Sequence, residues 1–233
     1  MALNHFTYNG QSTTAYGLLV TGRRVYGGPS RKVEKFSVPG RNGDILVDMG
    51  AYENYTVVYD LAIIDFQVNA RAIVNWLLSS KGYGELTDTY DPTHFRLGAC
   101  YSNIEYVTTA LNREGNATIE FDCKPQRFLN SGQDKTTITS SSATVTNPTA
   151  HNAKPLLRVY GTGTIVVNGY TIKINAVNSY VDIDCETQQA YKGTTNCNND
   201  IEVDEFPQLQ PGSNTITKTG VTSIELYPRW WEL

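Results

Sequence analysis

The sequence predicts a mainly β protein in two domains, of which the first contains one α-helix and the second is a β-sandwich. Short β-branched and aromatic runs alternate with turn residues along most of the 233 positions, and a single segment has helical spacing. The chain becomes polar between Leu129 and Pro155. We therefore place the domain boundary at residue 130, which gives domains of residues 1–130 and 131–233.

Composition and charge limit the possible functions. With 40% hydrophobic and 18% charged residues, the chain can bury a core. Its 19 basic and 23 acidic residues give a net charge of −4 without any Lys/Arg run, so tight nucleic-acid binding is not expected. The N-terminus does not resemble a signal peptide, and the longest aliphatic run, Leu61–Ile64, cannot cross a bilayer. We expect synthesis in the cytoplasm and no membrane contact.

One helix is predicted in the first domain, after a buried strand over Thr56–Ile64. Its apolar positions recur at intervals of three and four residues, at Ala70, Ile73, Val74, Leu77 and Leu78. Asn69 is expected to cap the start of this helix and Gly82 to end it in the left-handed conformation. Later, Ala117–Cys123 alternates as a strand with one wet face, which we expect to end, or to lie at an edge, at Pro125.

The second domain begins after a linker-like stretch, Ser131–Lys135, and Thr136–Thr146 is interpreted as an exposed strand. Asn168-Gly169, between two β-branched runs, predicts a tight hairpin because both turn residues need positive φ. A strand over Tyr180–Cys185 follows, with Asp182 and Asp184 on its outer face. Ser223–Tyr227 is the last predicted strand. Short strands with regular turns indicate a sandwich.

No catalytic, cofactor-binding or metal-binding residue is predicted, and no cofactor is expected. The sequence contains neither a GxSxG nor an HExxH motif. Cys100, Cys123, Cys185 and Cys197 are expected to be free buried thiols. The acidic residues Asp182, Asp184, Asp200, Glu202 and Asp204 are interpreted as solvated strand faces, with paired-carboxylate hydrolysis as the alternative. A Ca²⁺ site formed by Asn198, Asn199, Asp200, Glu202 and Asp204 is a further alternative.

A set of short motifs is spread over nearly the whole chain. The motifs of the first half are Val38–Ile45, Tyr52–Asn54, Trp76-Leu77, Leu86–Asp88, Tyr90–Pro92 and Phe121–Phe128. Those of the second half are Asn147–Thr149, Pro155, Tyr160–Gly163, Ile183-Asp184, Pro211–Asn214 and Pro228–Trp230. In this order, the set resembles the distal tail proteins of long-tailed phages and prophages of Gram-positive bacteria.

This resemblance implies a split-barrel N-terminal domain that forms a six-membered ring and a galectin-like C-terminal sandwich facing outward. Such a ring joins the tail tube protein to tail-tip, receptor-binding or baseplate proteins at the virion's tail tip, and DNA passes through it without specific binding. Some relatives carry an inserted carbohydrate-binding module, for which 233 residues leave no room.

Two sets of residues are candidate contacts. The loop Val38–Asp44 is interpreted either as a surface turn or as a fixed loop docking on a neighbouring subunit, with Arg41 binding a carboxylate in bidentate fashion. Its interface candidates are Pro39, Gly40, Arg41, Asn42, Gly43 and Asp44. Trp230 and Trp231 either stack on a sugar or pack the end of the last strand.

The leading interpretation is a structural ring subunit and not an enzyme. The first alternative is a carbohydrate-binding module of an adhesion device, which rests on the likeness of the predicted sandwich to lectins. The second alternative is a glycoside hydrolase. Saturable glycan binding that depends on the two terminal tryptophans would favour the first alternative, and turnover of a cell-wall polymer would favour the second.

Overall fold

The computed structural model describes residues 3–23, 27–108 and 114–233, and its fold is mainly β. The chain divides into two compact units, Met1–Arg127 with Leu233, and Phe128–Glu232. The division falls between Arg127 and Phe128, whereas the sequence analysis placed it at residue 130. Each unit has its own hydrophobic core.

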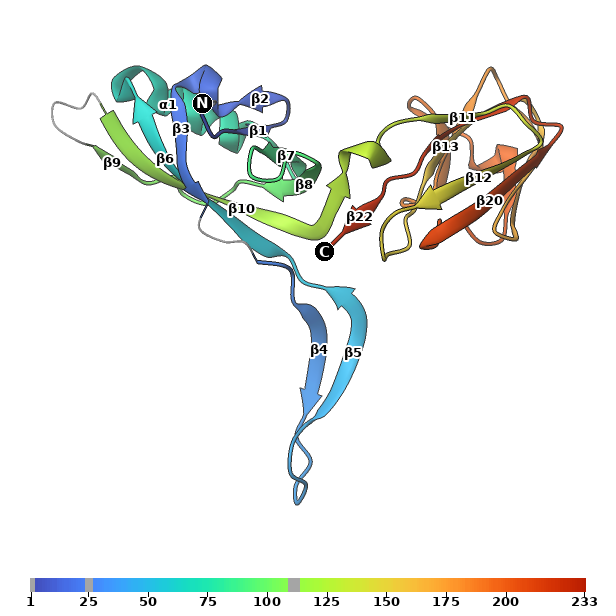
Figure 1. Ribbon diagram of the computed structural model, residues 1–233, viewed down its shortest axis with the longest axis horizontal. Coiled ribbons are helices and arrows are strands. Elements are labelled where there is room, and N and C mark those ends of the chain that lie inside the picture. The colour runs from blue at the N-terminus through green and yellow to red at the C-terminus, as the bar shows by residue number, and fades with distance from the viewer. Residues whose placement is uncertain (1–2, 24–26, 109–113) are drawn as a thin grey trace. The chain divides into compact units, whose positions relative to one another are not determined.

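The first unit is built on a curled, half-barrel sheet (Figure 1). Its strand order is β2-β1-β7-β8-β10-β6-β3, and β9 also pairs with β10. The strands are β1 (Phe6–Tyr8), β2 (Gln11–Ser12), β3 (Leu18–Arg23), β6 (Tyr55–Ile64), β7 (Gly84–Asp88), β8 (His94–Ala99), β9 (Tyr106–Thr108) and β10 (Glu114–Leu129). Two further strands, β4 (Arg31–Phe36) and β5 (Ile45–Tyr52), pair only with each other in the described residues.

Helix α1 spans Phe66–Ser79, and it is the one α-helix of the described residues. The predicted start was wrong, because the helix begins before Asn69, whose amide instead donates to the Ile64 carbonyl at 2.8 Å. The predicted end at Gly82 was also late, since the chain is already extended at Ser80. The predicted buried face holds at Ile73 and Leu77, which lie in the first core.

An aromatic cluster forms the centre of the first core. Phe121 of β10 is fully buried, and its ring centroid lies 5.4 Å from that of Phe6, 5.1 Å from Tyr8 and 6.1 Å from Tyr59. Trp76 of α1 stacks on Phe6 with centroids 6.0 Å apart. Edge-to-face and offset ring pairs add to the stability that burial alone provides, so this cluster fastens α1 to the sheet.

Strand β10 confirms the predicted alternation, because Ile119, Phe121 and Cys123 are all buried. Of the two alternatives predicted at Pro125, the end of the strand is wrong, since β10 continues to Leu129. The ladder with β6 stops at Cys123, which pairs with Tyr55, the first residue of β6. A proline lacks the N–H that a ladder needs, and β6 has no residue opposite Pro125 to require one.

The second unit is a sandwich of two sheets that enclose the second core. One sheet has the order β11-β21-β13-β16-β17-β18 and the other β12-β20-β14-β15-β19. The strands of these sheets are β11 (Thr136–Ile138), β12 (Ser142–Asn147), β13 (Leu156–Tyr160), β14 (Gly163–Val167), β15 (Tyr170–Ile174), β16 (Val181–Asp184), β17 (Gln189–Lys192), β18 (Thr195–Asn196), β19 (Ile201–Val203), β20 (Gly212–Thr219) and β21 (Ser223–Tyr227). The short strand β22 (Trp231–Glu232) follows β21 in the chain and belongs to neither sheet.

The predicted hairpin at Asn168-Gly169 is confirmed. Val167 pairs with Tyr170 across a two-residue turn, and φ is 51° at Asn168 and 93° at Gly169. Positive φ at both positions gives the turn the twist that antiparallel strands require. The hairpin joins two strands of one sheet, as the sequence predicted.

Two predictions near the start of the second unit were wrong. Thr136–Thr146 is not one strand but two, β11 and β12, which belong to different sheets. Ser131–Lys135 is not a free linker, because Gly132 is buried and its carbonyl accepts a hydrogen bond from Arg229 N–H at 2.8 Å. A Cβ at Gly132 would lie 2.4 Å from the Trp230 nitrogen, so no larger residue fits there.

No helix within the described residues is long and apolar enough to span a bilayer.

Truncating the central ring of the first core tests the packing. Phe121→Ala is expected to lower the free energy of unfolding by about 3–5 kcal/mol, because it removes buried apolar area and leaves a cavity. Urea denaturation followed by tryptophan fluorescence measures the loss. Val107→Ala, at an exposed site on β9, is the control and should change stability by less than about 0.5 kcal/mol. Equal effects of the two changes would contradict the described core.

Candidate interaction surface

Strands β4 and β5 form a two-stranded arm, defined here as residues 31–52, whose residues are nearly all exposed (Figure 1). The strands are antiparallel, with Phe36 opposite Ile45 and Glu34 opposite Val47. In the described residues no other strand pairs with either of them. Both long edges of this ribbon therefore carry open backbone groups.

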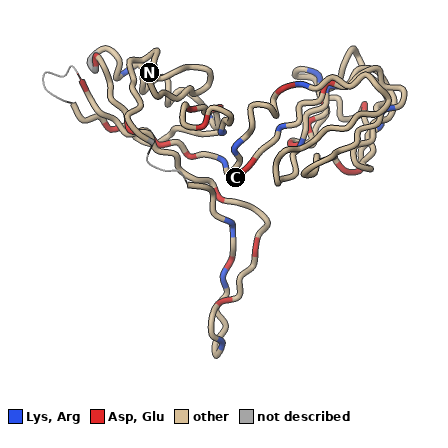
Figure 2. The backbone as a smooth tube through the Cα atoms, in the orientation of Figure 1, with Lys and Arg blue, Asp and Glu red and all other residues tan. Residues whose placement is uncertain are grey.

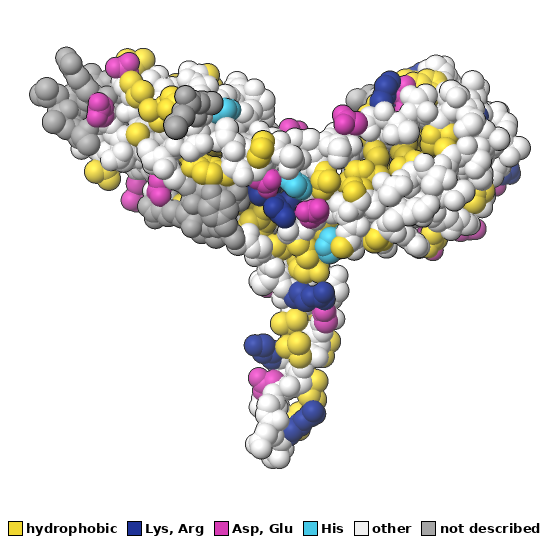
Figure 3. Space-filling model, viewed as in Figure 1, with side chains coloured by type: hydrophobic (Ala, Val, Ile, Leu, Met, Phe, Trp, Pro, Cys, Tyr) yellow, Lys and Arg dark blue, Asp and Glu magenta, His cyan; other side chains and the backbone are white. Residues whose placement is uncertain are grey.

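Register places most apolar side chains on one face of the arm, called here the apolar face. Because side chains alternate along a strand, the pair Phe36 and Ile45 shares a face with Val47 and Met49. These four side chains are 38% to 54% exposed. Figure 3 shows hydrophobic side chains along the arm with charged ones between them. The same register puts Glu34, opposite Val47, on the apolar face, and it puts Leu46 on the opposite face with Val33, Lys35 and Asp48.

The six candidate contact residues lie together in the tip loop of the arm. All of Pro39, Gly40, Arg41, Asn42, Gly43 and Asp44 are exposed. Gly40 and Gly43 have φ of 81° and 78°, a conformation that glycine adopts without strain. The Arg41 N–H donates to the Val38 carbonyl at 3.1 Å, which closes the tip. The structure thus presents the loop at the end of a longer apolar surface that the sequence analysis missed.

The base of the arm is held by polar contacts. Arg31 Nη1 lies 2.6 Å from Asp48 Oδ2, and the other carboxylate oxygen of Asp48 accepts from Gly50 N–H at 2.9 Å. The amide of Gly50 and the guanidinium of Arg31 lower the pKa of Asp48. Glu53 N–H donates to the Ser30 carbonyl at 2.8 Å. These contacts fix the register of the arm and leave its apolar face uncovered.

An isolated two-stranded ribbon is marginal in water. Full burial of one apolar side chain contributes about 1.5–3 kcal/mol, so covering four that are roughly half exposed would contribute several kcal/mol to association. The arm thus has both open edges and an apolar face, the two features that a neighbouring polypeptide can cover.

Unlike the residues of the arm, the residues of several other sequence motifs contact one another within the chain. Arg96, almost fully buried, donates to the Tyr55 hydroxyl at 2.9 Å and to Asp91 at 2.8 Å. Arg127 lies 3.3 Å from the same Asp91 carboxylate and donates to the Leu233 carbonyl at 3.1 and 2.9 Å. Burial alone would raise the pKa of Asp91, but His94 and the two arginines lower it. The motif around residues 90–92 therefore serves folding.

The prediction that Asp182 and Asp184 lie on a solvated strand face was wrong, because these residues are only 4% and 5% exposed. Arg158, directly opposite Asp182 on β13, binds it through two hydrogen bonds of 2.7 and 2.9 Å. Arg229 binds Asp184 at 2.7 and 3.1 Å. Each carboxylate is hydrogen-bonded to an arginine, so neither acid is available for hydrolysis. The Asp184–Arg229 pair links two motifs that lie far apart in the sequence, Ile183-Asp184 and Pro228–Trp230.

Burial alone would raise the pKa of Asp184, but Arg229 and the backbone N–H groups of Glu186 and Thr187 lower it below its usual value. Because the folded pKa lies below the unfolded one, this pair stabilises the fold above the unfolded pKa of about 3.9. The contribution is lost as the pH falls through the folded pKa.

Buried asparagines account for two further motifs. Asn147 donates to the carbonyls of His151 and Leu209 at 2.9 and 3.0 Å. Asn214, fully buried, accepts from Gln210 N–H at 2.7 Å and donates to the Gly212 carbonyl at 2.9 Å. Each side chain replaces backbone partners that a loop cannot supply. These motifs shape loops of the sandwich.

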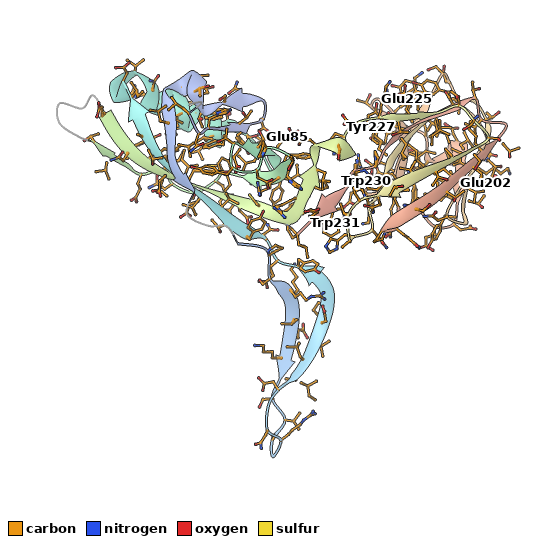
Figure 4. All side chains as sticks on the ribbon, in the orientation of Figure 1. Glu85, Glu202, Glu225, Tyr227, Trp230 and Trp231 are labelled. Atoms are coloured by element: carbon orange, nitrogen blue, oxygen red, sulfur yellow. The ribbon has the colours of Figure 1, made fainter. Side chains whose placement is uncertain are left out.

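The two terminal tryptophans, labelled in Figure 4, differ in exposure. Trp230 belongs to the second core, where it is 5% exposed. Trp231 is partly buried, stacks on His151 at 4.3 Å between centroids, and donates to the Asn152 carbonyl at 2.9 Å. Both tryptophans thus pack within the second unit, and their contact with a sugar stays a prediction.

The side chains that could bind a metal or act as nucleophiles do not gather in one place in the described residues. In the described parts of the chain no three His, Cys, Asp or Glu side chains gather as a metal site. None of the four cysteines forms a disulfide in the described residues, and three of them are buried as predicted. The prediction of a buried thiol was wrong at Cys197, which is partly exposed. Burial raises the pKa of the Cys100 thiol to about 11. Such a thiol stays protonated at neutral pH and is a poor nucleophile.

Glu202, labelled in Figure 4, is one of the residues considered for Ca²⁺, and it binds other partners. Its carboxylate lies 3.0 Å from Lys173 Nζ and accepts from the Asn175 amide at 2.7 Å. A lysine beside a carboxylate disfavours a bound cation. Glu202 thus forms an ion pair at the surface of the sandwich.

Comparison with known proteins was made at the levels of sequence and of fold. No protein-family model matches the sequence, and no curated protein matches it. Among solved structures, the SPP1 Dit (gp 19.1) protein, presented as a paradigm of the hub adsorption apparatus in phages infecting Gram-positive bacteria, aligns over 100% of both chains with a TM-score of 0.72 and 16% identity.

Structures of the phage P2 baseplate in its activated conformation, with Ca and with Sr, contain chains that align over 97% of both partners. Their TM-scores are 0.57 and 0.54, at 12% and 11% identity. This chain has the fold of a phage tail hub protein. The fold implied by the motifs is thereby confirmed across both units.

The Asp184–Arg229 pair generates a stability prediction. Arg229→Gln is expected to lower the free energy of unfolding by about 1.5–3 kcal/mol at pH 7, because it leaves a buried carboxylate without its charged partner. Chemical denaturation at a series of pH values measures this. The difference from the wild type should shrink below pH about 4, where Asp184 becomes protonated in the unfolded chain.

Lys173→Gln is the matched control, since it removes an exposed ion pair with Glu202 and should change stability by less than about 1 kcal/mol. A deficit in Arg229→Gln that stayed constant down to pH 2 would contradict the ionic origin of the effect.

Proposed function

We propose that this chain is a structural subunit of a phage tail hub, which assembles into a six-membered ring between the tail tube and the tail-tip or host-adhesion proteins. The observation that carries the proposal is the arm, whose apolar face is uncovered in the chain. The fold shared with the SPP1 Dit protein over the whole chain supports it.

The arm fits a contact between identical subunits. A ring needs two different patches on each subunit, so that each copy gives one surface and receives another. A projecting ribbon with its tip loop is one such patch, because it can lie on a neighbour without disturbing its own core. Arg41, exposed at the tip, would pair with a carboxylate of that neighbour.

The charge distribution supports passage of DNA without binding. Acidic and basic residues are interspersed along the backbone of both units (Figure 2). With a net charge of −4, the surface lacks the basic excess by which proteins grip phosphates. A ring of such subunits would let DNA move through its hole because nothing holds the backbone.

The proposed role is structural and not enzymatic. The acid residues considered for hydrolysis, Asp182 and Asp184, are bound by arginines. The partners we propose are further copies of the chain, the tail tube protein, and a tail-tip, receptor-binding or baseplate protein. The proposed location is the tail tip of the virion, after assembly in the host cytoplasm.

A charge on the apolar face tests the ring. Val47→Asp is expected to convert an assembly of about six times 25.8 kDa into monomers, because an interface does not tolerate a buried unpaired carboxylate. Size-exclusion chromatography with multi-angle light scattering measures the mass. The fold of the monomer should be unchanged, since Val47 is 41% exposed, and circular dichroism checks this.

Val107→Asp is the matched control, because it makes the same change at an exposed valine outside the arm. It should assemble like the wild type. A wild-type chain that stays monomeric at high concentration, alone and with its tail tube protein, would contradict the proposal. So would a Val47→Asp variant that still forms rings.

A further inference from the structure

Strand β12 is the longest open edge of the sandwich. The edge strands of its two sheets are β12 and β19 in one and β11 and β18 in the other. β12 has six residues, β11 and β19 have three each, and β18 has two. A long edge strand is a template for another extended chain unless something protects it.

The hydrogen-bond pattern shows which groups of β12 are open. Lys218 N–H donates to the Ser141 carbonyl at 2.9 Å, so every second residue from Ser141 bonds to β20. Ser142, Thr144 and Thr146 therefore direct their N–H and C=O groups away from β20. The Ser142 carbonyl accepts from the Ser140 hydroxyl at 2.7 Å, which leaves Thr144 and Thr146 with both groups available.

The usual protections of an edge are missing from β12. Its ladder with β20 has no bulge, and the strand contains no proline. No charged residue occurs between Thr136 and Ala153. The opposite edge of the same sheet, β19, is short and carries Glu202 next to Lys173. The β19 edge of this sheet is therefore protected against pairing with another strand, and the β12 edge is not.

The inner face of β12 is incompletely covered. Ala143 and Val145 point into the sandwich, yet both are only partly buried. An added strand would place its own inward side chains beside them and extend the core. Its outward side chains would meet Thr144 and Thr146, which favour hydroxyl-bearing or β-branched neighbours across a ladder.

We propose that β12 is a strand-addition site, at which an extended segment of a different tail protein joins the sheet beyond β12. The segment is of about six residues, uncharged, and alternates apolar with hydroxyl-bearing side chains. A charged side chain on its inward face would be buried beside Ala143 and Val145 without a partner, at a cost. Its backbone would bond to Thr144 and Thr146.

The choice of a different protein over a second copy rests on the proposed ring. Two identical β12 edges pair antiparallel only across a two-fold axis. Neighbours in a six-membered ring are related by rotation about one common axis, so their β12 strands cannot pair in this way. Each subunit of the ring therefore keeps one open edge for another polypeptide.

The test uses a fluorescein-labelled peptide with the sequence of residues 141–147, which has the required alternation, and the full-length chain. Fluorescence anisotropy should show saturable binding, and hydrogen exchange should show protection of the Thr144 and Thr146 amides. Thr144→Pro removes the outward N–H and should weaken binding about tenfold or more.

Thr144→Val is the matched control and should bind like the wild type, because its backbone groups are unchanged. A peptide with lysine in place of its valine should not bind. Absence of peptide binding, or equal binding by Thr144→Pro, would overturn the proposal. Self-association of the chain that Thr144→Pro abolishes would make the occupant a second copy and overturn it too. Val47→Asp should bind the peptide normally, so failure of the ring and failure of this site are distinguishable.

Discussion

In the described residues nothing covers the apolar face of the arm of β4 and β5, and the proposed function rests on this constraint. Elsewhere each sheet finds its cover: α1 packs on the curled sheet, and the two sheets of the sandwich cover each other. The arm is a single ribbon with four roughly half-exposed apolar side chains. A soluble protein keeps such a surface when another molecule covers it.

The motifs that link this sequence to tail hub proteins fall into two kinds. Most act inside the chain: Asp91 binds Arg96 and Arg127, Asp184 binds Arg229, and Asn214 orders its own loop. They fix the two folds and hold no reactive group. The segment Val38–Ile45 differs, because its residues lie exposed at the arm's tip. This segment is therefore accessible for contact with another molecule.

The sequence predicted the elements that local rules determine. The Asn168-Gly169 hairpin follows from φ alone, and the alternation in β10 follows from one buried face. The start of α1 at Phe66 was missed because its first turn has no side-chain cap. The burial of Asp182 depends on Arg158 standing opposite it on β13, and such a register is set by long-range pairing that no local pattern records.

The arm itself could not be predicted, apart from its tip loop. Arg31–Phe36 is mostly charged, and a ribbon without a core shows no clear alternation of buried and exposed residues. The glycines and proline at the tip were visible because turns have local signatures. The open edge of β12 was hidden for a similar reason, since only sheet order reveals which strand lies last.

Hydrogen exchange of the arm, measured by mass spectrometry on ring and monomer fractions of the same preparation, tests the central claim most directly. In the monomer the amides of residues 31–36 and 45–52 should exchange rapidly, because the ribbon is marginal on its own. In the ring they should be strongly protected. Protection already present in the monomer, or rapid exchange of the arm within the ring, would contradict the claim that this surface exists to be covered by a neighbour.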